Sequence, residues 1–234
     1  YDFRMHCFDN PTLALNIRNP IDRLASWYHY EHIENMAVLW RDRIVSCGQQ
    51  MLFKCYNSFY DLAEYGLAGT RPPPTQLLQV HSNASEDVCR HWAWATVQGA
   101  APASFHNIWN YDWYGSPALA FDREIIVFRA KHNEEDWRRV DILLGGSGSV
   151  PSLMHANDAS KTGIPVHNTT VSKQGHLNLC KALCHEIQVY KQLMNAAINL
   201  NEEDTMESLR ELNCPDDMTP EARLCPQNYF DYFV

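Results

Sequence analysis

A set of polar side chains near the start of the chain could bind a phosphate-like anion. The apolar run 12–17 ends in Arg18, and Pro20 suits the first turn of a helix that starts at once. Arg23 and Ser26 fall on the polar stripe of that helix, opposite an apolar stripe. Helix N-termini bind phosphate through unpaired N–H groups and the helix dipole, and arginine adds a bidentate clamp. The spacing predicts an anion site built from Arg18, Ser26 and Arg23; an ordinary capped helix with a surface serine is the alternative.

Two further side chains could complete such a site. His6 stands a few residues before the apolar run, and the pKa of an imidazole suits the deprotonation of a hydroxyl near neutral pH. The alternative is that His6 is simply one of 11 histidines, close to a chain end. Lys173 follows a long loop and precedes a helical pattern, so it could bring a second cation and a helix N-terminus to the anion. An exposed lysine at a helix start is the alternative.

The elements that must position these residues can be read from periodicity and breakers. We expect an α/β fold with a parallel sheet covered by helices on both faces, because strand signals alternate with helical ones. The expected strands are 12–17 and 124–128, and the expected helices are 20–40, 49–65, 86–98, 133–144 (capped by Asn133), 174–200 and a short acidic helix in the tail. The remaining segments 66–85, 100–120 and 145–173 are expected to be loops or turn-rich.

Composition limits the classes of partner. The chain has 234 residues, of which 45% are hydrophobic, and a formal net charge of −9. A negative chain is not expected to grip nucleic acid or a heparin-like polyanion over a broad face, although one local anion pocket is compatible with it. We therefore expect no nucleic-acid partner, and a substrate that is neutral or weakly acidic.

Cysteine usage favours an oxidising secretory compartment. There are eight cysteines, an even number, and no CxxC pair. Cys47 with Cys55, and Cys214 with Cys225, each bracket a short segment that a disulfide could close, but the sequence alone leaves the pairing open.

A second cysteine pattern and an aromatic run have competing readings. Cys180, Cys184 and His185 could ligate zinc from one helix face, but no fourth ligand is evident, and a disulfide or a buried thiol is favoured. We therefore predict no metal. Aromatic side chains could stack on sugar rings, with core packing as the favoured alternative. These aromatic residues are Trp92, Trp94, Trp109, Tyr111, Trp113 and Tyr114.

Arg18-Asn19-Pro20, followed by Asp22-Arg23 and Ser26 on a strand-to-helix turn, resembles the 3′-phosphate-binding segment of the Golgi-type carbohydrate sulfotransferases. The segments 125–145 and 179–200 resemble the later strand–helix unit and the late helix of that family, so the resemblance covers roughly residues 5 to 200. It implies a P-loop-like fold and transfer of a sulfuryl group from the co-substrate PAPS to a carbohydrate hydroxyl, leaving PAP. It also implies that Arg18 and Ser26 contact the 3′-phosphate.

The same resemblance suggests a base and a missing part. Heparan and dermatan 2-O-type sulfotransferases carry a histidine shortly before the 3′-phosphate strand, which makes His6 the candidate base. The family holds the 5′-phosphosulfate with a P-loop-like turn before that strand, yet residues 1–11 contain no Gly-rich or Ser/Thr-Lys loop. We therefore expect the N-terminal part of the fold to be missing and the chain, as given, to bind the donor weakly and turn over little.

The resemblance also implies an organisation and a location. We expect a partial sulfotransferase-like domain over 1–200 and a cysteine-containing tail over 201–234. The expected compartment is the Golgi lumen, as a type II membrane protein anchored by a segment upstream of Tyr1, or secreted. Two alternatives remain open: a catalytically dead secretory binding domain that keeps the fold, and a P-loop kinase-like enzyme that clamps another phosphate.

Overall fold

The computed structural model describes residues 12–31, 52–70, 85–98, 111–120, 123–149 and 169–215, which group into two compact units. The first unit holds β1 (Thr12–Ile17), α7 (Tyr111–Ala120), β2 (Glu124–Arg129), α8 (Asn133–Leu143), α11 (Cys184–Ala196) from Gln188 onward, and α12 (Glu202–Leu212). The second unit holds α2 (Pro20–Glu31), α5 (Phe59–Asp61), the π-helix η1 (Leu62–Gly66), α6 (Glu86–Val97), α10 (Lys173–Ala182) and the start of α11.

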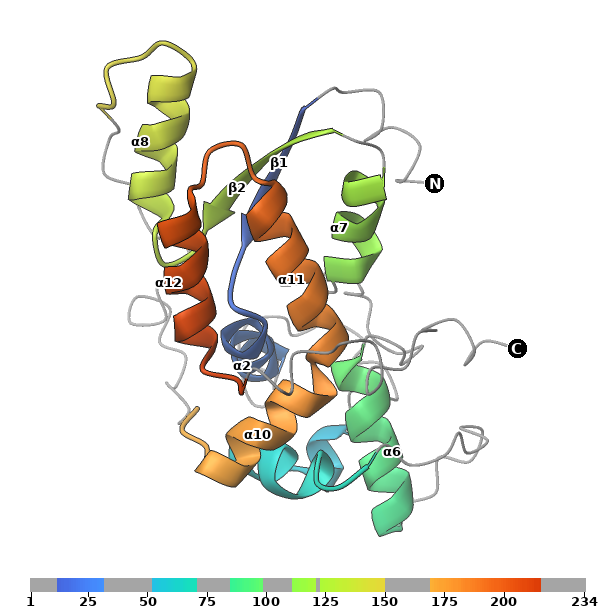
Figure 1. The fold of residues 1–234 in the computed structure, drawn as a ribbon. Helices are drawn as coiled ribbons and strands as arrows, with labels where there is room; N and C mark the ends of the chain where they lie inside the picture. Colours follow the sequence, from blue (N-terminus) through green and yellow to red (C-terminus); the bar gives the residue numbers. More distant parts are fainter. Residues whose placement is uncertain are drawn as a thin grey trace, which may run out of the picture. The chain divides into compact units, whose positions relative to one another are not determined.

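The first unit is built on a parallel pair of strands. β1 and β2 lie side by side in the register Thr12↔Glu124 through Ile17↔Arg129 (Figure 1). Both strands therefore end at the same edge of the sheet. The strands predicted over 12–17 and 124–128 are confirmed, and so is the mixed α/β class with a small parallel sheet flanked by helices.

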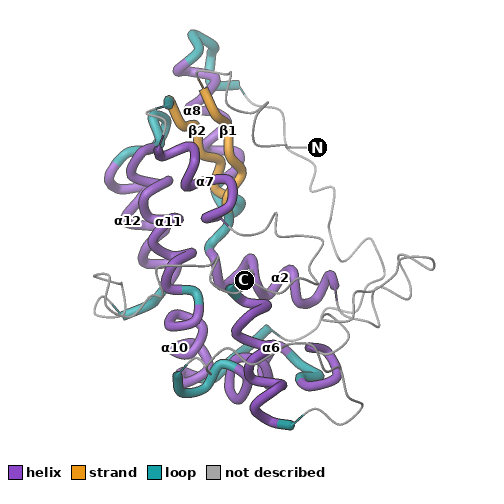
Figure 2. The backbone as a smooth tube through the Cα atoms, turned by 90° about the vertical axis from the view of Figure 1, so that its right-hand side faces the viewer, coloured by secondary structure: helices purple, strands orange, loops and turns teal. Residues whose placement is uncertain are grey.

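Successive side chains of a strand point to opposite faces of the sheet. In β2 the side chains on both faces are apolar, and helices cover both faces. Ile125 and Val127 of β2 join a buried cluster with side chains of α7 and α11. These two helices lie side by side in both Figure 1 and Figure 2. Ile126 and Phe128 point to the other face, where Val140 of α8 packs on them. The predicted covering of both faces thus holds for β2.

The outer edge of β2 is also paired. Ala197 forms a parallel bridge with Ile125, and the Ile198 N–H donates to the Ile125 carbonyl at 2.9 Å. The Asn199 side chain then takes the place of a strand residue: its Oδ1 accepts from the Val127 N–H at 2.9 Å and its Nδ2 donates to the Val127 carbonyl at 2.8 Å. The connection between α11 and α12 therefore extends the hydrogen-bonding of the sheet.

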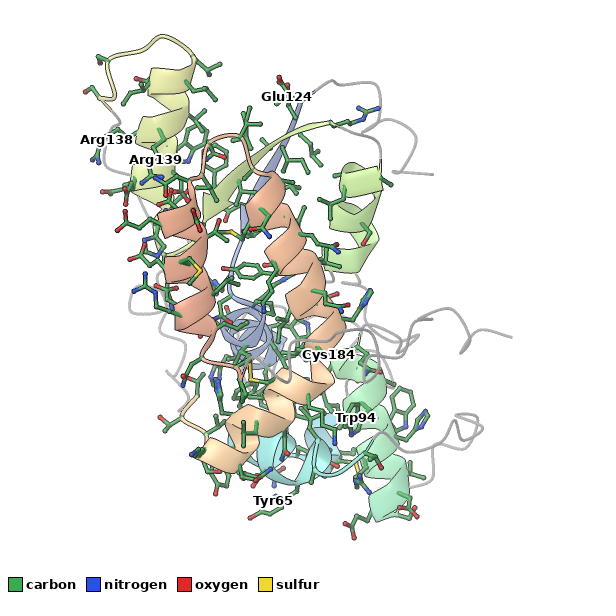
Figure 3. All side chains as sticks on the ribbon, viewed as in Figure 1. Tyr65, Trp94, Glu124, Arg138, Arg139 and Cys184 are labelled. Carbon is green, nitrogen blue, oxygen red and sulfur yellow. A yellow bond between two sulfur atoms is a disulfide. The ribbon has the colours of Figure 1, made fainter. Side chains whose placement is uncertain are left out.

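Buried charges hold α8 and α12 against the end of β2. Arg129 is 3% exposed, and its Nε and Nη2 donate to the Asp136 carboxylate on α8 at 2.7–3.1 Å. Its Nη1 donates to the Asp204 carbonyl at 3.2 Å and to Ser208 at 3.4 Å, both on α12. Arg139 of α8, labelled in Figure 3, donates to the Asp204 carboxylate. One arginine thus joins a strand and two helices.

The segment predicted to be turn-rich contains a helix instead. α7 spans Tyr111–Ala120 even though Gly115 lies inside it and glycine is a poor helix former. The glycine is needed for a close approach, because a Cβ at this position would lie 2.8 Å from the Leu193 Cδ1 and 3.2 Å from the Val189 Cγ1 of α11. Packing on α11 therefore outweighs the low local propensity.

Other helix boundaries differ from the prediction. The helix predicted over 174–200 breaks at Leu183, which ends α10 with φ −93° and ψ 11° before α11 begins. His132 rather than Asn133 occupies the N-cap of α8, because the Asp136 N–H already bonds to the His132 carbonyl. The helix predicted over 86–98 is confirmed. Among the described residues, none of the helices is long and apolar enough to span a membrane.

Aromatic side chains and disulfides hold the second unit. The Tyr28 ring of α2 packs edge-on against Phe53 and Phe59, with ring centroids 5.1 and 5.8 Å apart. Its hydroxyl donates to the Tyr56 carbonyl. Burial raises the pKa of Tyr28 well above its usual value, and the nearby Asp61 carboxylate adds to this shift.

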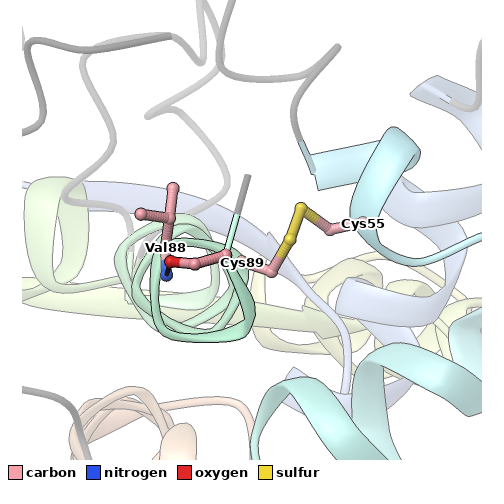
Figure 4. The surroundings of a disulfide bond; sticks show 4 residues. Cys55, Val88 and Cys89 are labelled. Carbon is pink, nitrogen blue, oxygen red and sulfur yellow. Dashed lines mark hydrogen bonds between the residues drawn. A yellow bond between two sulfur atoms is a disulfide. The ribbon is translucent and has the colours of Figure 1, made fainter. Parts of the chain in front are cut away.

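The disulfides differ from the short loops expected. Cys55 pairs with Cys89 of α6 (Figure 4), and Cys180 pairs with Cys214, each across 34 residues. The suggested Cys47–Cys55 and Cys214–Cys225 bridges are therefore wrong, because Cys55 and Cys214 are already paired with cysteines that lie far away in the sequence. The general prediction of disulfides is confirmed, and Cys184 is disulfide-bonded as well.

Candidate anion site at the end of strand β1

Arg18 lies where a strand leaves the sheet. β1 ends at Ile17, and two residues separate it from α2, which begins at Pro20. The last bond between the strands runs from the Ala130 N–H to the Ile17 carbonyl at 2.8 Å. The Arg18 side chain is exposed. Carboxyl ends of parallel strands are the usual ligand-binding edge of α/β sheets, so Arg18 stands at a place suited to an anion.

The main chain of Arg18 is fixed by one phenol. The Tyr111 hydroxyl accepts a hydrogen bond from the Arg18 N–H at 2.7 Å and donates one to the Arg18 carbonyl at 2.6 Å. Tyr111 is 1% exposed and stacks on Tyr190 of α11, with ring centroids 6.2 Å apart. Core packing, the favoured reading of the aromatic run, therefore applies to this ring, but its hydroxyl has a specific partner 93 residues away.

Tyr190, whose ring stacks on Tyr111, is buried as well. Burial raises the pKa of the Tyr190 phenol well above its usual value, and the neighbouring Tyr111 adds to the shift. The Tyr190 hydroxyl hydrogen-bonds with Ser208 of α12, which also accepts from Arg129. The Tyr190 hydroxyl thus belongs to the buried network at the end of β2, and the Tyr190 ring stacks on Tyr111.

Two of the predicted contacts lie on α2, in the second unit. Arg23 is half-buried and Ser26 is exposed. They are three residues apart on one helix, so they share a face. Asp22 lies in the first turn, where its charge suits the helix dipole. The residues of the predicted polar stripe therefore do lie on this helix, and none of these three is fully buried.

Lys173 begins α10, also in the second unit, and is exposed. Ser172 caps this helix by accepting from the Gly175 N–H at 3.1 Å. The Glu64 carboxylate accepts from the Ser172 N–H at 2.9 Å, so the start of α10 already faces an anionic group. We therefore keep the Lys173 ammonium, and not the helix N-terminus, as the proposed contact.

His6 lies outside the described residues, as does Trp109 of the aromatic run. Trp92 and Trp94 of α6 are 6% and 4% exposed. Core packing therefore accounts for these two rings, and they are not a sugar-stacking surface.

One group of possible metal ligands occurs among the described residues. Donor atoms of His176, Cys180 and Cys214 lie within 4.8 Å of one another. The two sulfur atoms are bonded to each other, so this group offers no thiolate to a metal. The disulfide alternative to a zinc site at Cys180 and Cys184 is confirmed.

Scans of this chain against protein-family models, curated proteins and solved structures find no match.

Proposed function

We propose that this chain is a carbohydrate sulfotransferase domain that uses PAPS, with a P-loop-like fold. The observation that carries the proposal is Arg18: an exposed arginine at the carboxyl edge of a parallel sheet, two residues before a helix that starts with proline. An arginine in that position can hold a phosphate through two parallel N–H···O bonds. We assign it the 3′-phosphate of the donor.

The other residues receive roles in the same reaction. Ser26, Arg23 and Lys173 are proposed as further contacts of the 3′-phosphate, and His6 as the base. The acceptor hydroxyl oxygen attacks the sulfur of PAPS in line with the leaving phosphate, and His6 takes the hydroxyl proton. The bond between sulfur and the bridging phosphate oxygen breaks, and PAP leaves. As in phosphoryl transfer, catalysis rests mainly on positioning and charge stabilisation. Unlike the magnesium-dependent phosphoryl transferases, the proposed reaction is assigned no metal.

The disulfides support the proposed compartment. Cys55–Cys89 and Cys180–Cys214 are typical of proteins that fold in oxidising surroundings, which include the secretory pathway. We therefore place the protein in the Golgi lumen, or in secretion, with a glycan as acceptor. The acidic chain, at −9, agrees with an acceptor that is neutral or weakly acidic.

Calorimetric binding of PAP, AMP and ATP to the chain tests the proposal. AMP lacks the 3′-phosphate and ATP carries its extra phosphates at the other end, so we expect PAP to bind more tightly than either. Arg18→Ala should weaken PAP binding by about 10- to 100-fold, as expected for loss of charge-assisted hydrogen bonds, and should leave AMP nearly unchanged. Arg138→Ala removes the same charge from an exposed position on α8 and is the matched control.

The outcomes separate the competing functions. Equal affinity for PAP and ATP, or a preference for ATP, would defeat the sulfotransferase assignment and favour a kinase-like enzyme. Little turnover is expected of the chain as given, so transfer is measured on a chain extended upstream of Tyr1. Selective PAP binding by that longer chain, without transfer from labelled PAPS to any glycan, would favour the catalytically dead binding domain. That alternative rests on one observation, the absence of a Gly-rich or Ser/Thr-Lys loop from residues 1–11. An unchanged PAP affinity in Arg18→Ala would mean that the phosphate contact is misassigned.

A further inference from the structure

The tyrosine beside the strand end makes an unusual pair of contacts. A single phenol bonds to both main-chain groups of one residue, at 2.7 Å to the Arg18 N–H and 2.6 Å to the Arg18 carbonyl. The residue before Arg18 still pairs with the sheet, since the Ile17 carbonyl accepts from Ala130. Strand pairing stops at Ile17. The Tyr111 hydroxyl therefore gives the Arg18 main chain the hydrogen bonds that a neighbouring strand gives to the residues before it.

The phenol is itself held rigidly. Tyr111 begins α7, is 1% exposed, and its ring stacks on the ring of Tyr190. A buried ring in such packing has little freedom to move. The Arg18 main chain is therefore fixed by a rigid group, while its side chain stays exposed.

We propose that Tyr111 is a positioning residue that fixes Arg18 for binding of the 3′-phosphate of a nucleotide. This inference rests on the proposed function. A flexible strand end would have to become ordered when the ligand binds, and this ordering weakens binding. Tyr111 removes that cost in advance for the Arg18 main chain, so that only the side chain has to become ordered when the phosphate binds. Tyr111 itself does not touch the ligand.

Tyr111→Phe isolates the hydroxyl, because it keeps the buried ring and removes both hydrogen bonds to Arg18. Tyr190→Phe is the matched control: it removes a buried hydroxyl from the stacked ring, but that hydroxyl bonds to Ser208 and not to Arg18. Calorimetric titrations with PAP and with AMP are made on wild type, both variants, Arg18→Ala and the Tyr111→Phe/Arg18→Ala double variant. Hydrogen exchange at the Arg18 amide, followed by mass spectrometry of short overlapping peptides, reports on the main chain without any ligand.

We expect Tyr111→Phe to weaken PAP binding about tenfold and AMP binding less than about twofold. In the Arg18→Ala background it should cause no further loss, because the hydroxyl acts only through Arg18. The Arg18 amide should exchange at least about tenfold faster in Tyr111→Phe, and at the wild-type rate in Tyr190→Phe.

Several results would overturn this inference while leaving the proposed function intact. They are an unchanged preference for PAP over AMP in Tyr111→Phe, an equal loss of both ligands, or a loss that adds to that of Arg18→Ala. An unchanged exchange rate at the Arg18 amide would refute the fixing of the main chain directly. If wild type does not prefer PAP over AMP, the proposed function itself fails, and the positioning role fails with it.

Discussion

Replacing the buried Arg129 by methionine should destabilise the fold more than any exposed charge substitution. Arg129→Met keeps a long apolar side chain of similar length and removes only the guanidinium. In the wild type this group makes five kinds of contact at the end of β2: Asp136, the carbonyl and carboxylate of Asp204, Ser208, and the outer Glu207. All but Glu207 are buried.

The expected loss of free energy of unfolding follows from the carboxylates that Arg129→Met leaves buried. Asp136 is 0% exposed and would keep one partner that the structure shows, the Arg129 main-chain N–H at 2.6 Å. Asp204 would keep Arg139 and the Asn201 N–H of its capping box. Removing one partner of a buried ion pair costs about 3–5 kcal/mol, because the other charge stays buried without compensation. We expect Arg129→Met to lose free energy of unfolding within this range, mostly through Asp136.

Urea denaturation followed by circular dichroism measures this loss. Glu135→Gln is the control, since Glu135 is 48% exposed and its pair with Arg139 should contribute at most about 0.5 kcal/mol. Arg129→Met/Asp136→Asn removes both charges of the buried Arg129–Asp136 pair but keeps an acceptor for the position 129 N–H, so it should recover at least about 1 kcal/mol over Arg129→Met. A loss below about 1 kcal/mol in Arg129→Met, or a double variant less stable than the single one, would refute the reasoning.

Two other predictions concern the second unit. Peptide mapping without reduction should recover Cys55 bonded to Cys89, and Cys55→Ala/Cys89→Ala should lower the free energy of unfolding by about 3–4 kcal/mol for a loop of 34 residues; a change below about 1 kcal/mol would contradict it. Burial raises the pKa of Tyr56 to about 12, whereas the unfolded phenol ionises near 10, so stability should be complete below about pH 10 and fall as the pH rises toward about 12. Urea midpoints across this range should decline less steeply in Tyr56→Phe, and an equal decline would contradict the assignment.

Local signals were sufficient for some elements of the fold. Short apolar runs predicted the strands at 12–17 and 124–128, which β1 and β2 match within a residue. The helix predicted over 86–98 matches α6, and the Ser85 hydroxyl caps its start. These elements carry their own boundary signals, and tertiary packing agrees with them.

Other elements depend on contacts that no local pattern encodes. α7 contains Gly115, which lowers helix propensity, and the helix forms because it packs closely on Leu193 far along the chain. The break at Leu183 has no glycine or proline to announce it, and the apolar stripe continues across it. The pairing of Cys55 with Cys89 likewise follows from the fold, not from spacing.

In the candidate site, too, one residue could be predicted from a local pattern and another depends on a distant contact. Arg18 could be selected from the sequence because an arginine between a strand and a proline-started helix is a local pattern. Tyr111 could not be selected, since its partner is 93 residues away and an aromatic residue in an aromatic run is most simply a core residue. Its role depends on the position of one hydroxyl, which only the arrangement of α7 beside β1 provides.

Two arginines at the same edge of the sheet show why exposure and pairing decide their roles. Ile17 and Arg129 are paired across the two strands, so Arg18 lies one residue beyond the residue that is opposite Arg129. Arg129 is buried and its charge is compensated by Asp136 and Asp204, which leaves it nothing to offer a ligand. Arg18 is exposed and has no carboxylate partner in the part of the chain that the structure describes. Arg129→Met should therefore change stability, and Arg18→Ala should change anion binding at nearly unchanged stability. Both substitutions remove a guanidinium, so the different outcomes follow from the different environments of the two arginines: one is buried and paired, and the other is exposed.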